Sequence, residues 1–147
     1  YGADLVVLHS LDSYRSFKWQ TEWLSRQLDA VVYGDLTTPE NFTSMNKKQS
    51  GLYSQLIYTH DKNWRMGVRY DTIYQNDITK DSVDMNEVDD FNKYSAMIEY
   101  HTSEFARFRL QYNRNEAMYD EAGLRQNLDT IMLQANIAIG AHAAHSF

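Results

Sequence analysis

Within the last segment of the chain, residues 127–147, apolar and polar or small side chains alternate with a period of two from Ile131 onward. Ile131 and Leu133 belong to one set, and Gln134 and Asn136 belong to the other. Successive side chains of a strand point to opposite faces, so the pattern predicts a strand with one apolar face. An exposed apolar strand promotes aggregation in a soluble protein, whereas strands of transmembrane barrels alternate lipid-facing and lumen-facing residues. We therefore predict an all-β fold, an antiparallel up-and-down transmembrane β-barrel, with this segment as its closing strand.

The composition is compatible with a barrel and excludes several other classes. The chain has 147 residues, one Pro, no Cys, 11 Tyr and a formal net charge of −6. No apolar run approaches the roughly 18 residues of a membrane-spanning helix, but barrel strands carry their hydrophobicity in alternation. The net negative charge argues against a nucleic-acid partner. No motif such as G-x-S-x-G or H-E-x-x-H is present, so we do not expect an enzyme.

Turn and loop signals divide the chain into seven predicted strands, over residues 3–10, 16–33, 51–60, 64–75, 93–102, 105–115 and 127–147. Short turns are expected at 12–14, 61–63 and 102–104, and long polar loops at 35–50, 76–91 and 116–126. Outer-membrane barrels have short periplasmic turns, long extracellular loops and even strand numbers. We therefore expect residues 1–147 to be the carboxy-terminal part of one larger barrel domain. We expect at least one further strand before Tyr1, which begins the chain without Met or a signal peptide.

Side-chain parity predicts which residues face each other across the sheet. A three-residue turn at 61–63 places Leu56 opposite Val68 on the lipid side. The next short turn places Glu99 opposite Arg107, an opposite-charge pair inside the barrel. The same reasoning pairs Tyr58 with Met66, Gln55 with Arg69, and Tyr53 with Asp71.

The inward-facing positions carry many charged side chains, which we interpret as pore-lining. Rings of charge inside a barrel tune which solutes pass. Six basic against three acidic positions, with histidine neutral, favour anions. A salt-bridged ladder that fills the lumen is the alternative, and both readings stay open. The predicted pore-lining residues are Lys18, Glu22, Arg26, Arg65, Arg69, Asp71, Glu99, His101, Arg107 and Arg109.

Aromatic residues at the strand ends are typical of the girdles that outer-membrane barrels place at both membrane interfaces. The alternative is the core of a soluble sandwich, which shares the alternation but not the ordered asymmetry of the loops. The predicted girdle residues are Trp19, Trp23, Trp64, Tyr70, Tyr100 and Tyr112.

Residues 76–91 form an acidic segment whose oxygen ligands suit a divalent cation. The spacing is not that of an EF-hand loop, so a solvated extracellular loop is the favoured interpretation. The carboxylates concerned are Asp77, Asp81, Asp84, Glu87, Asp89 and Asp90.

Three stretches carry a resemblance to one group of Gram-negative proteins: WRMGVRYD at 64–71, SEFARFRLQY at 103–112, and the ending GAHAAHSF at 140–147. The chain resembles the carboxy-terminal region of porin-like barrels described as zinc-regulated outer-membrane receptors. The resemblance spans most of the chain and is most specific at the ending. It implies a location in the bacterial outer membrane and a link to metal uptake. Outer-membrane lipid and lipopolysaccharide are then expected partners, and the barrel-assembly machinery is expected to read the strand that ends in Phe147.

His142 and His145 are the candidate metal ligands, because imidazole suits zinc. Residues three apart on a strand point to opposite faces, so only His142 is expected to face the lumen. The alternative is that both are interface residues near the periplasmic rim. We expect no cofactor, and zinc at these histidines is the one candidate.

The main functional hypothesis is a porin-like channel for small hydrophilic solutes, with a link to zinc uptake. A second hypothesis is a gated metal receptor that needs a plug and an energy-coupling partner in the inner membrane. A third is a structural or adhesive barrel without an open pore. An upstream plug domain would favour the second, and a tightly paired, non-conducting lumen would favour the third.

Overall fold

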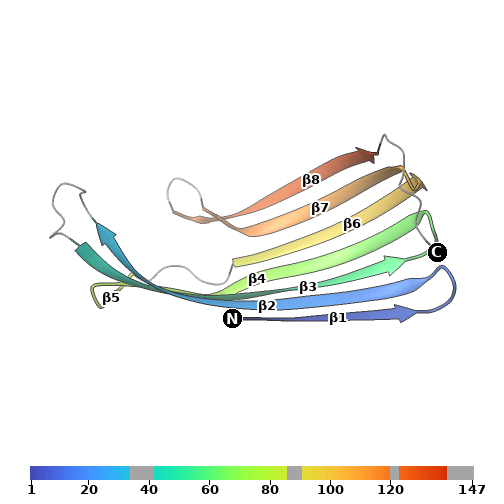
Figure 1. Ribbon diagram of the computed structural model, residues 1–147. Coiled ribbons are helices and arrows are strands. Elements are labelled where there is room, and N and C mark those ends of the chain that lie inside the picture. Colours follow the sequence, from blue (N-terminus) through green and yellow to red (C-terminus); the bar gives the residue numbers. More distant parts are fainter. Residues whose placement is uncertain (34–41, 86–90, 120–122, 139–147) are drawn as a thin grey trace.

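The computed structural model describes residues 1–33, 42–85, 91–119 and 123–138, and all regular structure within them is β. Each long strand pairs antiparallel with its neighbour along the chain, in the order β1-β2-β3-β4-β6-β7-β8, and the short β5 pairs with β4 (Figure 1). This up-and-down antiparallel sheet confirms the predicted all-β class. Within the described residues the sheet is open, because β1 and β8 do not pair with each other. The strands are β1 (Gly2–Ser10), β2 (Ser16–Tyr33), β3 (Phe42–Thr59), β4 (Trp64–Lys80), β5 (Val83–Asp84), β6 (Phe91–Ser103), β7 (Ala106–Tyr119) and β8 (Arg125–Ile137).

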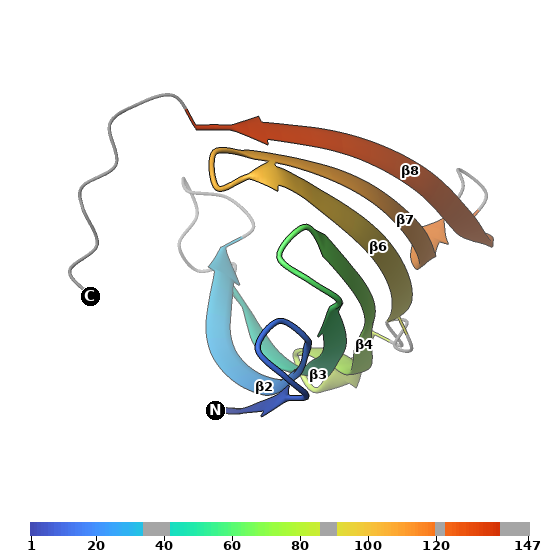
Figure 2. The ribbon, with the colours of Figure 1, turned by 90° about the vertical axis from the view of Figure 1, so that its right-hand side faces the viewer.

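The sheet curls into a trough along the strand direction (Figure 2). No apolar side chain is buried among the described residues, and the three buried residues are the polar Ser50, Glu99 and Asn113. The sheet therefore has no hydrophobic core of its own over these residues. None of the described segments forms a helix that is long and apolar enough to cross a membrane.

Two of the short turns are closed by an aspartate that stands two residues after its strand. Asp12 Oδ1 accepts hydrogen bonds from the backbone N–H groups of Tyr14 (2.9 Å) and Arg15 (2.7 Å). Asp61 Oδ1 does the same for the N–H groups of Asn63 (2.8 Å) and Trp64 (2.7 Å). Aspartate favours turns because its side chain can satisfy backbone donors in this way. These contacts explain why the two turns fall where the composition places them.

The three predicted long loops are wrong in their extent. Residues 42–50 belong to β3, residues 76–80 to β4 and 83–84 to β5, and residues 116–119 and 125–126 extend β7 and β8. Polar composition indicated loops, but an extended polar segment is stable in a sheet when a neighbouring strand satisfies its backbone groups. β2 does this for the first half of β3, with pairs that run from Arg26–Gln49 to Tyr33–Phe42.

The predicted register is confirmed between β3 and β4 and is wrong between β6 and β7. Leu56 pairs with Val68, as predicted. The other three predicted pairs are also present: Tyr58–Met66, Gln55–Arg69 and Tyr53–Asp71. Across the next turn Glu99 pairs with Arg109, and Arg107 pairs with His101. The strands meet at a turn over residues 104–105 instead of 102–104, and the register then shifts by one residue between His101 and Ser103. Together these differences move the pairing by two residues from the predicted one.

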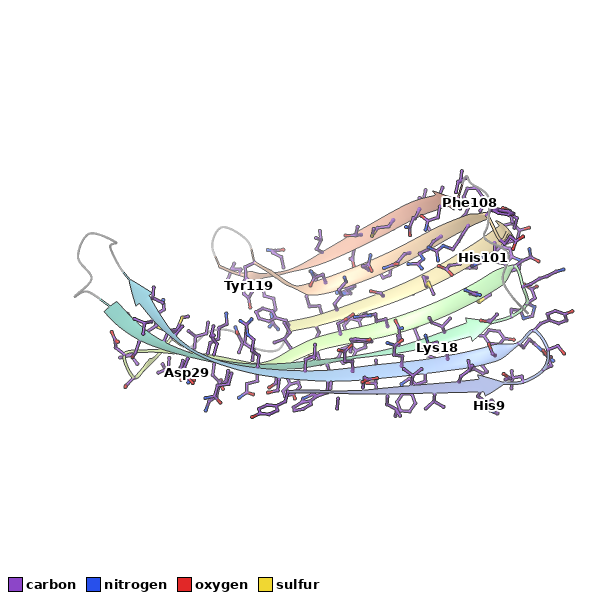
Figure 3. All side chains as sticks on the ribbon, viewed as in Figure 1. His9, Lys18, Asp29, His101, Phe108 and Tyr119 are labelled. Carbon is purple, nitrogen blue, oxygen red and sulfur yellow. The ribbon has the colours of Figure 1, made fainter. Side chains whose placement is uncertain are left out.

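The register aligns apolar side chains into rows on one face of the sheet. One row runs through all seven long strands as Val7, Trp19, Leu56, Val68, Ala96, Tyr112 and Ile131. The next row toward the short turns is His9, Phe17, Tyr58, Met66, Ile98, Leu110 and Leu133. We call this side the apolar face and the opposite side the polar face. Figure 3 shows the alternation at the first turn, with His9 below the sheet and Lys18 above it.

Side chains of the polar face are the more shielded set. Within the apolar rows Val68 and Leu110 are 58% and 46% exposed, whereas Glu99 and Asn113 on the polar face are buried. The third buried residue, Ser50, lies on the outward side beyond these rows, where it contacts Ser25. Side chains on the concave side of a curved sheet converge and cover one another, and those on the convex side diverge. We conclude that the polar face lines the trough and that the apolar face points outward.

Candidate functional site

All ten predicted pore-lining residues lie on the polar face. Glu22 pairs with Tyr53, which pairs with Asp71, and Arg65 pairs with Glu99, which pairs with Arg109. The remaining members lie on the same face by parity along their strands: Lys18 and Arg26 on β2, Arg69 on β4, His101 on β6 and Arg107 on β7. The structure thus gathers residues from four strands into one concave surface.

The register adds four charged residues to this face that the sequence reasoning missed. Lys93 stands opposite Asp71, Lys47 opposite Leu28, Lys80 opposite Met45, and Asp4 opposite Glu22. Lys93 could have been found by extending the parity of Glu99 back along β6, whereas the two β3–β4 lysines fell in segments taken for loops. Over the described residues the balance becomes nine bases (six plus three) against four acids (three plus one), with histidine neutral. The face is basic although the whole chain has a net charge of −6.

Glu99 is the centre of an ion cluster at the short-turn end of this face. Its side chain is 3% exposed. Arg109 donates a 2.7 Å hydrogen bond from Nε to Glu99 Oε1 and pairs with the same oxygen through Nη2. Arg107 Nη1 lies 3.4 Å from Oε1, and His101 Nε2 lies 3.4 Å from Oε2. One carboxylate is thus compensated by two guanidinium groups, so the cluster carries net positive charge.

A second ion pair lies on β4. Arg69 donates from Nε to both oxygens of Asp71 at 2.9 and 3.0 Å, and from Nη2 to Oδ1 at 2.5 Å. The Arg69 guanidinium also lies 3.9 Å from the ring centroid of Tyr53 on β3. A bidentate pair and a cation–π contact together hold a guanidinium in one orientation. These contacts therefore hold the Arg69 guanidinium in one orientation within the trough.

Neutral amides fill the space between these ionic groups. Gln20 donates from Nε2 to Tyr53 Oη at 2.9 Å, and Gln55 donates from Nε2 to Gln20 Oε1 at 3.1 Å. On β7, Gln111 Nε2 donates to Asn113 Oδ1 at 2.7 Å. No side-chain nitrogen or oxygen that is buried among the described residues lacks a hydrogen-bond partner. The polar face is thus built as a satisfied network, as groups that are shielded from water require.

A hollow of about 470 Å³ lies in the middle of the polar face. Its lining includes the cations Arg69, Lys93 and Arg109 and the neutral polar side chains Gln55, Ser95 and Gln111. Asp71 is the one carboxylate among its lining residues, and Arg69 already engages it. Three cations from three strands therefore line one water-accessible space, with Lys93 and Arg109 toward its opposite ends.

The apolar face carries the predicted girdle aromatics, several of them in ring pairs. Trp64 and Tyr100 have centroids 4.6 Å apart, and Tyr70 and Tyr94 have centroids 5.2 Å apart. Trp19 donates from Nε1 to Ser54 Oγ at 2.9 Å. The sixth girdle residue, Tyr112, lies beside Ala96 and donates from Oη to Asp129 at 2.7 Å.

Trp23 Nε1 donates a hydrogen bond of 2.5 Å to Tyr74 Oη, and this contact marks the end of the apolar rows away from the short turns. Directly beyond it the outward side chains are polar. There Ser50 Oγ lies 3.0 Å from Ser25 Oγ and 2.9 Å from Gln75 Oε1. The outward side of β2, β3 and β4 thus changes from apolar to hydrogen-bonded polar side chains along one line across three strands.

The predicted metal ligands His142 and His145 lie outside the described residues, as does Phe147. No three histidine or carboxylate side chains are grouped for metal binding in the part of the chain that the structure describes. Of the acidic segment, Glu87, Asp89 and Asp90 also lie outside the described residues. Asp81 is used structurally, since its Oδ1 accepts a 2.8 Å hydrogen bond from the Ser44 N–H.

An uncharacterized protein of Aquifex aeolicus (strain VF5) is 37% identical to the chain over all 147 residues. The chain spans 30% of the length of that curated relative. No protein-family model and no solved structure matches the chain.

Proposed function

We propose that this chain is part of an outer-membrane β-barrel that forms a porin-like channel for small hydrophilic solutes, with a preference for anions. The observation that carries the proposal is the division of one curved sheet into an apolar convex face and a basic concave face. A sheet that buries no apolar side chain over its described residues needs an apolar environment on its outside. Lipid supplies that environment in a transmembrane barrel, and water fills the polar interior.

The dimensions of the apolar face support a membrane location. On β4 its aromatic limits are Trp64 and Tyr74, which are ten residues apart. At about 3.3 Å per residue these residues span about 33 Å. A strand tilt of about 40° reduces this to about 25 Å, which is the height of the apolar band in outer-membrane barrels. The polar side chains beyond this line are then expected to stand outside the hydrocarbon.

Single-channel conductance tests the proposal directly. The full-length protein that contains these residues is purified in detergent, shown to be folded, and added to a planar bilayer in potassium chloride. Steady conductance steps are expected, and a salt gradient should give a reversal potential of the sign for anion selectivity, because bases outnumber acids on the polar face. Folded protein that leaves the bilayer silent contradicts the channel and favours a plugged receptor or a structural barrel.

A pair of charge reversals tests whether the polar face sets the selectivity. Lys18→Glu changes the face itself, whereas Lys62→Glu makes the same change in the β3–β4 turn. Lys18→Glu should shift the reversal potential toward cations and Lys62→Glu should shift it much less. Equal shifts would contradict a conduction path along the polar face. The same conductance measurement is repeated with zinc on both sides of the bilayer, because the resemblance implies a link to metal uptake.

A further inference from the structure

We propose that the hollow lined by Arg69, Lys93 and Arg109 is a binding subsite for a small oxyanion of the phosphate class. This inference rests on the proposed function and names the class of solute that the channel would concentrate. Guanidinium groups match oxyanions through parallel N–H donors, and an ammonium group adds a compact point charge. The hollow combines both kinds of cation with neutral amide and hydroxyl groups from Gln55, Ser95 and Gln111.

The two arginines are positioned before any ligand arrives. Arg69 is held by Asp71 and by the Tyr53 ring, and Arg109 is held by Glu99. Arg69 contacts Asp71 through Nε and Nη2, and Arg109 contacts Glu99 through the same two nitrogens. Among the residues that the structure describes, no carboxylate forms a salt bridge with the Nη1 group of either arginine. Groups that are already oriented lose less conformational entropy when they bind an anion.

Lys93 is the cation of the hollow that the carboxylates leave uncompensated. It stands opposite Asp71 in the register, but the Asp71 carboxylate is engaged by Arg69. Within the described residues no carboxylate forms a salt bridge with Lys93, and its side chain is exposed. An incoming anion would therefore meet, beside the fixed Arg69 guanidinium, an ammonium group that forms no salt bridge with the described carboxylates. Arg109 lies toward the other end of the hollow, opposite Glu99, six residues along β6 from Lys93.

The geometry favours a free solute over the phosphate of a lipid headgroup. The hollow lies in the trough on the polar face, and lipid is expected against the opposite, apolar face. A volume of about 470 Å³ accommodates an oxyanion together with part of its hydration shell. Retained water keeps binding weak, which suits a site that must release its solute for conduction.

Titration calorimetry of inorganic phosphate against the folded full-length protein in detergent, at low ionic strength, tests the subsite without relying on conduction. Saturable binding is expected, and Lys93→Gln should weaken it about fivefold, since a unit charge a few ångströms away contributes on that scale. Lys93→Arg should retain most of the affinity. Lys62→Gln, the same loss of charge in an exposed turn, should leave it unchanged.

The subsite would be overturned by the absence of saturable phosphate binding to the folded protein, or by equal affinities of Lys93→Gln and the unaltered protein. Binding by lipopolysaccharide phosphate alone, without binding of inorganic phosphate, would also overturn it. Conductance separates these failures from failure of the channel. Steady conductance with no phosphate binding leaves the channel standing without the subsite, and Lys93-dependent binding with silent bilayers leaves the subsite standing without the channel.

Discussion

Glu99 and Arg109 face each other across β6 and β7, and the Arg109 Nε group donates a 2.7 Å hydrogen bond to Glu99 Oε1. The Glu99 side chain is 3% exposed, so most of its hydration has been replaced by protein groups. A shielded charge is tolerated only where partners compensate for the lost water. Arg107, two residues away on the same strand, supplies the second compensating cation.

Replacing Arg109 with Gln should destabilise the folded protein by about 1–3 kcal/mol, because it removes the shortest contact to a shielded carboxylate while Arg107 remains. The midpoint of urea unfolding in detergent, followed by tryptophan fluorescence, measures this change. Arg65→Gln is the matched control, since Arg65 pairs with Glu99 in the register but forms no salt bridge within the described residues. The double variant Glu99→Gln/Arg109→Gln should lose less stability than Arg109→Gln alone. A greater loss would show that Glu99 is not the reason for the effect.

The same pair shows how far sequence reasoning reaches. Parity correctly assigned Glu99 and both arginines to one face, although it paired Glu99 with Arg107. The observed register differs by two residues because the turn lies at 104–105 and an irregularity stands between His101 and Ser103. A slip of two residues preserves the face of every side chain, whereas a slip of one would invert it. Face assignments are therefore more robust than pair assignments, and the basic character of the polar face was predictable while its ion pairs were not.

The limits of the long loops were not predictable for a different reason. Residues 42–50 carry few apolar side chains, so neither periodicity nor burial distinguishes them from a loop. Their strand conformation depends on backbone pairing with residues 25–33 of β2. Backbone pairing of this kind cannot be recognised from the amino-acid composition of the segment. Short turns were easier to locate because Asp12 and Asp61 satisfy backbone donors within the turn itself.

Asp12 should make the first turn sensitive to acid. Backbone N–H groups of Arg15 and Tyr14, and then the Arg15 side chain, lower the pKa of the Asp12 carboxyl to about 2. A carboxyl whose pKa is lower in the folded state stabilises that state above its unfolded pKa of about 4, and this stabilisation is lost as the pH falls toward 2.

The stability difference between the unaltered protein and Asp12→Asn should therefore shrink as the pH falls from about 4 to about 2. Asparagine retains a side-chain oxygen that can accept the backbone bonds, so the comparison removes the charge together with the hydrogen bond from Arg15 Nε. Carbon-13 titration of the Asp12 carboxyl provides the direct check. A midpoint near 4 would contradict the contacts that we assign to this turn. The pKa of Asp61 is also lowered, by the Trp64 and Asn63 N–H groups, so its carboxyl should titrate below the ordinary aspartate range as well.

Two glycines of the sheet should respond differently to alanine. A Cβ on Gly51 would lie 2.6 Å from the Thr72 backbone oxygen, at the place where the β3–β4 register shifts. A Cβ on Gly67 would lie 2.8 Å from Met97 Cε, the mobile end of a flexible side chain. Backbone yields less readily than a methionine, so Gly51→Ala should cost about 1–3 kcal/mol and Gly67→Ala clearly less. Urea unfolding of both variants measures the order, and a larger cost at Gly67 would contradict the close approach at the bulge.

Neighbouring residues on β7 allow a test of which medium each face meets. Leu110 lies on the apolar face and is 46% exposed, and Gln111 lies on the polar face beside the hollow. If the apolar face meets lipid, Leu110→Arg should destabilise the folded protein by about 2 kcal/mol or more, because a charged side chain in hydrocarbon loses its hydration. If that face meets water, a half-exposed position should tolerate arginine with a change within about 0.5 kcal/mol.

Gln111→Arg introduces the same side chain one residue away, and it should cost much less in a water-filled interior even though it adds to a basic surface. Both variants are refolded into lipid vesicles, and their unfolding free energies are compared in the same lipid. A large penalty at Leu110 with a small one at Gln111 is the result that a membrane-spanning sheet requires. Equal small penalties would mean that the apolar face is not against lipid, and the channel would then lose the observation that carries it.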